Sequence, residues 1–202
     1  TSVLVSGTLN RVMIVELGIP ASLVGLFFAL PLLISPLRVW LGYQSDARPI
    51  FGLRREPFII FGSMAAGLGV VAATLLVLQP ASFNMGWALV VALAFTAYGV
   101  GKNLSSNTFE ALLADKFTGD QRPRAVTFFK VAMFLGIMLG ALLLGRLLDP
   151  FSGARLVVIV VGAAGLGLVL AVVAVLRQEP RKASPGAEVV MGRKIPFWEA
   201  FK

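Results

Sequence analysis

The stretch PFIIFGSMAAGLGVVAATLLVLQ (residues 57–79) contains no Asp, Glu, Lys or Arg. A helix of this length crosses about 30 Å of hydrocarbon, because each residue adds about 1.5 Å of rise. Apolar side chains lie all around such a helix, whereas a helix on the surface of a soluble protein has an apolar stripe and a polar face. The stretch therefore predicts a transmembrane helix.

The composition of the whole chain extends this prediction. Of the 202 residues, 57% are hydrophobic and only 14% are charged, which fits poorly with a water-facing surface. Gly and Pro residues separate further apolar runs. The first run is short for a full crossing, so we expect the chain to begin within a span. We predict an all-α integral membrane protein with six spans, at residues 1–17, 22–40, 57–79, 87–114, 124–148 and 155–177.

The basic residues indicate how these spans are oriented, since Lys and Arg favour the cytoplasmic side during membrane insertion. Most of the 18 lie in the 2–3 connection, the 4–5 connection or the tail, and only Arg146 and Arg155 lie in the opposite connections. This predicts that both termini are cytoplasmic. It also explains the net charge of +8 by topology and contact with membrane lipid, so we expect no nucleic-acid partner.

Enzymatic chemistry is not expected from this sequence. The chain has no Cys and no His, which excludes thiolate metal sites, thiol nucleophiles and the commonest general base. Paired carboxylates and metal-ligand spacings are missing as well. The glycines at 136, 140 and 145 and at 162, 165 and 167 have the spacing of close helix contacts, and we expect them to be structural.

The predicted fourth span has a polar face within an otherwise apolar helix. At 100° per residue its polar side chains fall in one arc, with Lys102 near the middle of the membrane. The first span adds further polar groups. The candidate cavity residues are Asn10, Arg11, Glu16, Lys102, Asn103, Ser106, Asn107 and Glu110. One interpretation is a polar cavity between spans 1 and 4, with Glu110 or Glu16 as the counter-charge of Lys102. The other is a set of helix-to-helix hydrogen bonds with no ligand.

The connection LGYQSDARPIFGLRREPF (residues 41–58) resembles the loop 2–3 signature of the major facilitator superfamily. That signature has a Gly, an Asp four residues later, and then a Gly with paired basic residues. It would form a charge network that latches the cytoplasmic side, and the matching residues are Gly42, Asp46, Gly52, Arg54 and Arg55. The sequence departs from the pattern by having Ala47 after the Asp and about three extra residues before Gly52. A loop that serves only to orient the spans is the alternative.

Three segments together resemble one branch of this superfamily, the PucC/LhaA family of light-harvesting complex assembly factors from phototrophic bacteria. They are residues 9–46, GLRREPFIIFGS (52–63) and FEALLADKFTGDQRPRAVTFFKVAMFLGIMLG (109–140). The resemblance implies the N-terminal half of a twelve-helix major-facilitator-type fold, in a bacterial cytoplasmic or intracytoplasmic photosynthetic membrane. Residues 1–179 would form the six-helix bundle, and residues 180–202 a cytoplasmic linker toward a second half.

The resemblance also implies a function. The protein would assist the insertion and oligomerisation of light-harvesting antenna polypeptides, with the reaction centre complex as a further candidate partner and bacteriochlorophyll as a transiently held pigment. In this interpretation Trp40, Phe83 and Trp87 dock antenna helices. The alternative is a secondary transporter of a small solute or tetrapyrrole, in which Lys102, Glu110 and the polar groups of span 1 bind the solute.

Overall fold

The computed structural model describes residues 4–33, 55–79, 84–117, 119, 121–176 and 178. Residues 4–16, here called the N-terminal helical segment, include two π-helical stretches, Leu4–Leu9 and Val12–Glu16. The α-helices that follow in the described residues are α1 (Ala21–Leu33), α3 (Glu56–Leu78), α4 (Met85–Lys116), α5 (Gln121–Leu147) and α6 (Gly153–Val175). None of the described residues forms a strand. The fold is therefore all-α in the part of the chain that the structure describes.

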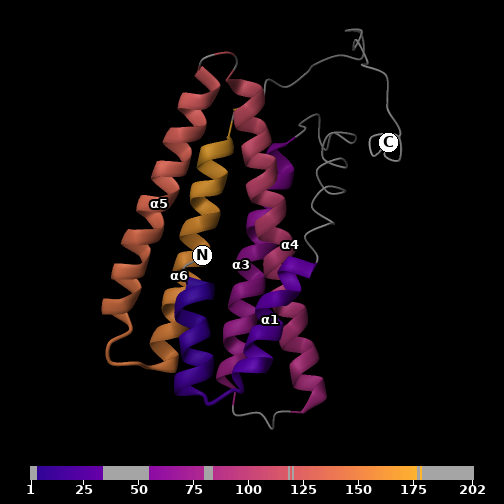
Figure 1. The fold of residues 1–202 in the computed structure, drawn as a ribbon, viewed down its shortest axis with the longest axis vertical. Helices are drawn as coiled ribbons and strands as arrows, with labels where there is room; N and C mark the ends of the chain where they lie inside the picture. The colour runs from indigo at the N-terminus through magenta and orange to yellow at the C-terminus, as the bar shows by residue number, and fades with distance from the viewer. Residues whose placement is uncertain are drawn as a thin grey trace.

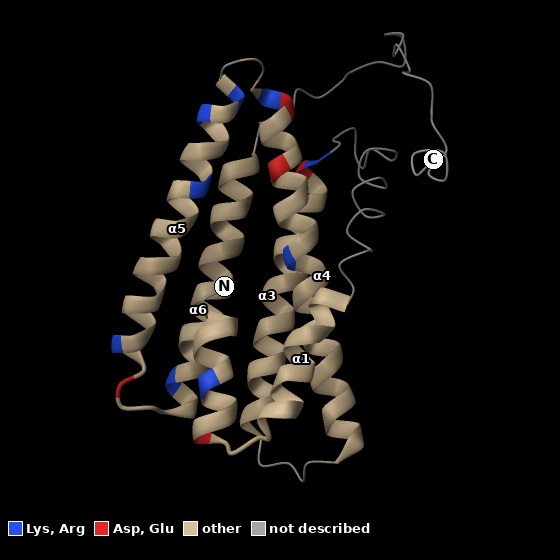
Figure 2. Cartoon of the chain, viewed as in Figure 1, with Lys and Arg blue, Asp and Glu red and all other residues tan. Residues whose placement is uncertain are grey.

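Four of these helices, α3 to α6, are long and apolar enough to cross a membrane. They agree with the last four predicted spans. Helix α1 covers only part of the predicted span 22–40, whose remainder lies outside the described residues, as does the predicted linker 180–202. Figure 2 shows that charged residues gather at the two ends of the bundle. The chain is therefore a multi-pass membrane protein.

Local sequence signals explain where the helices begin and end. Helix α3 has Pro57 in its first turn, where the missing N–H has no helical partner to lose. At the start of α4, the side chain of Asn84 accepts a hydrogen bond of 2.8 Å from the backbone N–H of Trp87. Gly119 adopts a φ of 56° in the short turn before α5, a conformation that favours glycine. The connections between α3, α4, α5 and α6 are short in sequence, and these consecutive helices run antiparallel (Figure 1).

Helices α3 and α4 are in close backbone contact, and glycines make it possible. A Cβ added at Gly101 would lie 2.4 Å from the backbone nitrogen of Ala66, and one at Gly69 would lie 2.4 Å from that of Tyr98. Gly62 faces the backbone of Ser105 in the same way. Small residues allow this approach, which drives helix association in lipid through van der Waals contact. The α3–α4 pair is the framework of the fold.

The glycines of α5 and α6 that the sequence analysis selected do not make close helix contacts with other described residues. Around Gly136, Gly140 and Gly145 of α5 nothing lies within 4 Å of an added Cβ, and the same holds for Gly162, Gly165 and Gly167 of α6. The prediction that these glycines make close helix contacts is therefore wrong within the described residues. Their spacing indicates a smooth helix surface, but spacing alone does not show whether a neighbouring helix covers it.

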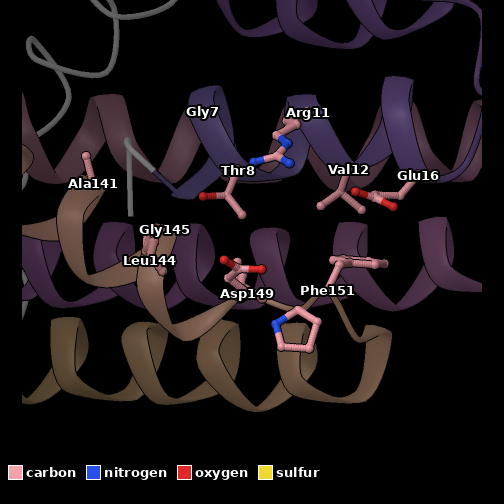
Figure 3. A pocket seen from close by; sticks show the side chains of 12 residues that line it. Gly7, Thr8, Arg11, Val12, Glu16, Ala141, Leu144, Gly145, Asp149 and Phe151 are labelled. Atoms are coloured by element: carbon pink, nitrogen blue, oxygen red, sulfur yellow. The ribbon is translucent and has the colours of Figure 1, made fainter.

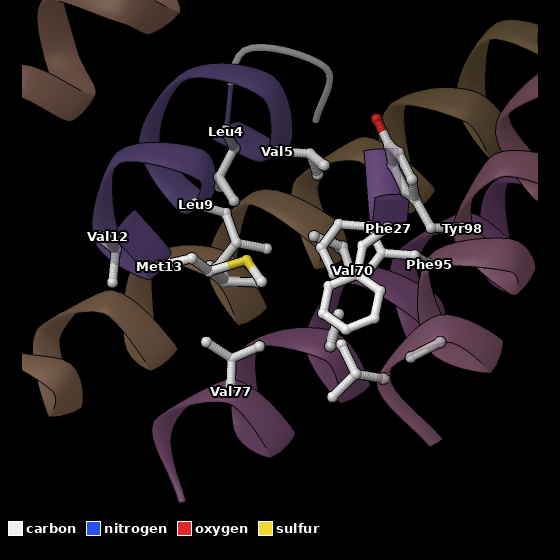
Figure 4. Close-up of a cluster of buried hydrophobic side chains, with 14 of the residues drawn as sticks. Leu4, Val5, Leu9, Val12, Met13, Phe27, Val70, Val77, Phe95 and Tyr98 are labelled. Atoms are coloured by element: carbon white, nitrogen blue, oxygen red, sulfur yellow. The ribbon is translucent and has the colours of Figure 1, made fainter. Parts of the chain in front are cut away.

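The core lies between the N-terminal helical segment, α1, α3, α4 and the first part of α6 (Figure 4). The rings of Phe27 and Phe95 stack with centroids 5.8 Å apart, and Phe27 meets Trp87 edge-on at 6.1 Å. Leu9 and Met13 of the N-terminal helical segment are fully buried against this cluster. Helix α1 meets α4 where Pro31 fills the space beside Gly99. Gly99 of α4 therefore serves helix packing.

Helix α5 stands at the edge of the bundle, and none of its residues is buried (Figure 1). Its exposed apolar side chains are spread around its circumference, including Phe134, Leu135, Met138, Leu139, Leu142 and Leu143. A helix that is apolar on all sides is stable where lipid or another apolar helix surrounds it. Helix α5 is thus the least buried of the four membrane-length helices in the described residues.

Candidate functional site

The polar face of α4 opens into a small pocket near the middle of the bundle. Lys102, Ser105 and Ser106 line it together with Ser63 of α3, and its volume is about 130 Å³. The hydroxyls of Ser63 and Ser105 are hydrogen-bonded at 2.8 Å. Ala164 and Gly167 of α6 form the opposite wall. A charge at this depth costs about 2.5–3.5 kcal/mol on insertion scales, which marks Lys102 as a candidate functional residue.

A larger pocket of about 740 Å³ lies at one end of the bundle. Thr8, Arg11 and Glu16 of the N-terminal helical segment line one side, and the end of α5 with Asp149 lines the other. In Figure 3 the side chains of Arg11, Thr8 and Asp149 point into the same space, with Glu16 further along the helix. The pocket therefore combines one cationic and two anionic groups.

The structure separates polar residues that the sequence analysis placed in one cavity. Arg11 and Glu16 line the large pocket, whereas Lys102 and Ser106 line the small one. Asn10, Asn103 and Asn107 are half-buried and line neither pocket. The physical reason is the packing of the N-terminal helical segment. Its apolar side, with Leu9 and Met13, faces the core, and this turns its polar side towards the end of α5.

Glu110 does not act as the counter-charge of Lys102. Its carboxylate instead accepts a hydrogen bond of 2.7 Å from Lys130 Nζ of α5, and both side chains are more than two-fifths exposed. Lys130 also lies 5.5 Å from the ring centroid of Phe129, and Phe129 in turn contacts Phe109 of α4. These contacts join α4 to α5.

Arg55 is the one proposed latch residue that the structure describes. Its guanidinium forms an ion pair of 2.8 Å with Asp115 near the end of α4, and its side chain is only 12% exposed. Lys116 donates a hydrogen bond to Gln178, which follows α6. Gly42, Asp46, Gly52 and Arg54 lie outside the described residues, so the latch stays a prediction. The contacts at Arg55 and Lys116 tie α4 to α3 and α6 at the same end of the bundle.

Four partners in these contacts were missed by the sequence analysis. Ser105 lies one turn beyond Lys102 on the same helix face, so the periodicity of α4 contained the signal for it. Ser63, Asp115 and Lys130 are contributed by packing between helices, and the sequence gives no sign of which helices pack together. Of the proposed docking groups, Trp87 is half-buried and its indole N–H donates to the carbonyl of Leu76 at 3.1 Å. Trp40 and Phe83 lie outside the described residues.

An apolar hollow, separate from the two polar pockets, lies between the end of α4 and the start of α5. It has a volume of about 620 Å³, and four aromatic side chains line it, with Arg124 at its edge. The aromatic residues are Phe109, Phe117, Phe128 and Phe129. Phe128 is 77% exposed, so this hollow continues the uncovered surface of α5.

Comparison with known proteins identifies the family. The sequence model of the PUCC protein family matches residues 8–200. The chain is 34% identical to Protein PucC of Rhodobacter capsulatus, with 100% of this chain and 45% of that protein covered. It is 36% identical to Protein PucC of Rhodovulum sulfidophilum, with 98% and 46% covered.

A further relative is named Bacteriochlorophyll synthase 44.5 kDa chain, from Rhodobacter capsulatus, and is 35% identical over 92% of this chain and 42% of its own length. The chain thus spans less than half the length of each of these three relatives. No solved structure matches it significantly. The family model matches nearly the whole chain and the relatives exceed 30% identity, so the chain belongs to the PUCC protein family.

Proposed function

We propose that this protein is a membrane assembly factor for bacterial light-harvesting antenna complexes, and that it assists the insertion and oligomerisation of antenna polypeptides. The observation that carries the proposal is membership of the PUCC protein family over residues 8–200. The name of one relative, Bacteriochlorophyll synthase 44.5 kDa chain, supports a role close to the antenna pigment. The multi-pass helical structure is consistent with work inside the membrane.

We further propose that the chain forms the N-terminal half of a major-facilitator-type fold, with both termini cytoplasmic and residues 180–202 as a linker. The relatives, about twice as long, support the proposal of two halves. The basic side chains support the orientation. Lys116, Arg122 and Arg124 flank the α4–α5 connection, and one end of the bundle is thereby richer in positive charge.

Helix α5 is the proposed docking surface for antenna helices. Between Lys130 and Arg146 it is apolar on all sides, none of its residues is buried, and glycines 136, 140 and 145 leave its surface open to close approach. Helices associate in lipid by van der Waals packing around such small residues. A transmembrane antenna helix would therefore pack against this apolar surface.

Bacteriochlorophyll would be held only weakly by the residues present. The chain has no His to ligate the central magnesium, and Glu110 is already paired with Lys130. The amide oxygen of Asn103, on the polar face of α4 but outside the pocket around Lys102, is a ligand of the hard type that magnesium accepts. This donor set fits transient handover of a pigment better than storage.

Affinity purification of the tagged full-length protein from pigmented membranes tests the assembly proposal. Mass spectrometry of the eluate should show antenna polypeptides enriched over an eluate from an unrelated tagged multi-pass protein of similar abundance. An absorption spectrum of the same eluate reports whether pigment accompanies them. Antenna polypeptides present only at the level of the control would contradict the proposal.

The alternative function is secondary transport of a small solute or tetrapyrrole, and one observation, the charged pocket of about 130 Å³ around Lys102, favours it for a small solute only. The variant Lys102→Met separates the two functions. If docking on α5 is the mechanism, antenna levels in cells producing this variant should equal those of the wild type. A loss of antenna comparable to deletion of the gene would favour the transporter instead. Lys102 should be changed alone, since removing Glu110 would leave Lys130 without its carboxylate.

A further inference from the structure

The pocket around Lys102 carries a positive charge that the described residues do not neutralise. The ion pairs among these residues join Arg55 to Asp115 and Lys130 to Glu110, and neither includes Lys102. Lys102 lies near the middle of α4, far from the charged ends of the bundle. A lysine at this depth is stabilised by an anionic partner or by water.

The neighbouring side chains add hydrogen-bond donors to this charge. Ser105 and Ser106 lie on the same helix, three and four residues after Lys102, and Ser63 approaches from α3. The hydrogen bond between Ser63 and Ser105 uses one hydroxyl hydrogen, so the other remains available to a ligand. The site therefore offers a cation and hydroxyl donors from two helices, with no carboxylate lining it.

Small residues keep the pocket open. Ala66 and Gly67 of α3 and Ala164 and Gly167 of α6 line it, and an alanine Cβ at Gly67 would meet Ala164 at 3.5 Å. The volume of about 130 Å³ accommodates about four groups of the size of water. This is enough for a small anion with part of its hydration, and too little for a tetrapyrrole.

We infer that Lys102, Ser105, Ser106 and Ser63 form a binding site for a small monovalent anion, a halide or a short carboxylate. One lysine balances one negative charge, while the surrounding apolar helices disfavour a multiply charged ion. A cation is excluded by the charge of Lys102. This inference does not depend on antenna assembly, and it specifies a ligand that the transporter alternative lacks.

Chloride is the probe that tests the site. The full-length protein in lipid nanodiscs is titrated with chloride in a gluconate background, and the chloride-35 NMR line width reports bound ion. The wild type should show saturable broadening that excess acetate removes. Lys102→Met should lose this saturable component, while Lys130→Met, which removes an exposed lysine elsewhere on the bundle, should retain it.

Two further variants keep the test decisive if Lys102→Met does not fold. Ser105→Ala combined with Ser63→Ala should weaken chloride binding by about tenfold, the effect of losing one hydrogen bond to an ion. Lys102→Arg should retain binding because it retains the charge. Broadening that is not saturable, that equals the wild type in Lys102→Met, or that persists in excess acetate would overturn the inference.

Discussion

At the scale of single residues, glycines decide how the two central helices meet. The sequence analysis expected structural glycines, but it selected those of α5 and α6, while the close contacts occur at Gly62, Gly69 and Gly101. Both sets have helical spacing. Only the packed structure distinguishes them, because the difference is whether another backbone lies opposite.

We predict that Gly101→Ala destabilises the protein by about 1–3 kcal/mol, the usual cost of adding a methyl group to a tightly packed site. The added Cβ would meet backbone atoms of α3 at 2.4 to 2.9 Å, and these cannot move without shifting the helix. Gly140→Ala on α5 is the matched control and should be neutral or slightly stabilising. Thermal unfolding in nanodiscs measures both, and equal melting temperatures for the two variants would contradict the α3–α4 contact.

The two ion pairs should respond differently to loss of their acidic partner. Asp115→Ala removes the carboxylate that pairs with the guanidinium of Arg55, whose side chain is only 12% exposed, and should cost roughly 1–3 kcal/mol. Glu110→Ala leaves the exposed ammonium of Lys130 in contact with solvent or headgroups, and should cost less than about 1 kcal/mol. The same unfolding assay compares them. A larger loss in Glu110→Ala would show that exposure does not govern these pairs.

At the scale of helices, the last four predicted spans agree with α3 to α6, because an uncharged run bounded by Pro or Gly is a strong local signal. The pairing of helices could not be predicted. Apolar residues surround each span, so hydrophobic periodicity does not indicate which face meets a neighbour. The polar arc of α4 was predicted, but its partners Ser63 and Lys130 come from α3 and α5.

Helix α5 should cross-link to antenna polypeptides if it is the docking surface. The chain has no native cysteine, so a single Leu142→Cys variant can carry a thiol-reactive photo-cross-linker without background. Leu68→Cys on α3 is the control, since Leu68 and Leu142 are similarly exposed, at 65% and 60%. We expect cross-links to antenna polypeptides in pigmented membranes mainly from Leu142→Cys. Equal yields from both positions would contradict a specific role for α5.

At the scale of the whole molecule, the hydrophobic spans predicted a multi-pass membrane protein, since length and hydropathy are properties of the chain itself. The orientation that the positions of Lys and Arg indicate stays a prediction. The sequence alone could not show whether the polar residues of spans 1 and 4 face the same cavity. They lie in two pockets because the apolar side of the N-terminal helical segment determines how that segment is turned.

The topology makes its own prediction. Cysteines introduced at Gln121, the first residue of α5, and at Ser152, between α5 and α6, should react with a membrane-impermeant thiol reagent from opposite sides. Gln121→Cys should be labelled only from the cytoplasmic side, where the basic residues are expected. Labelling of both positions from the same side would show that α5 does not cross the membrane.

The assembly function is tested most directly by the antenna content of membranes from cells that lack this protein. Near-infrared absorption of antenna pigment per unit of membrane should fall strongly when the gene is deleted, and it should return when the wild type or Lys102→Met is supplied. Unchanged antenna absorption in the deletion strain would contradict the proposal that this protein assembles light-harvesting complexes.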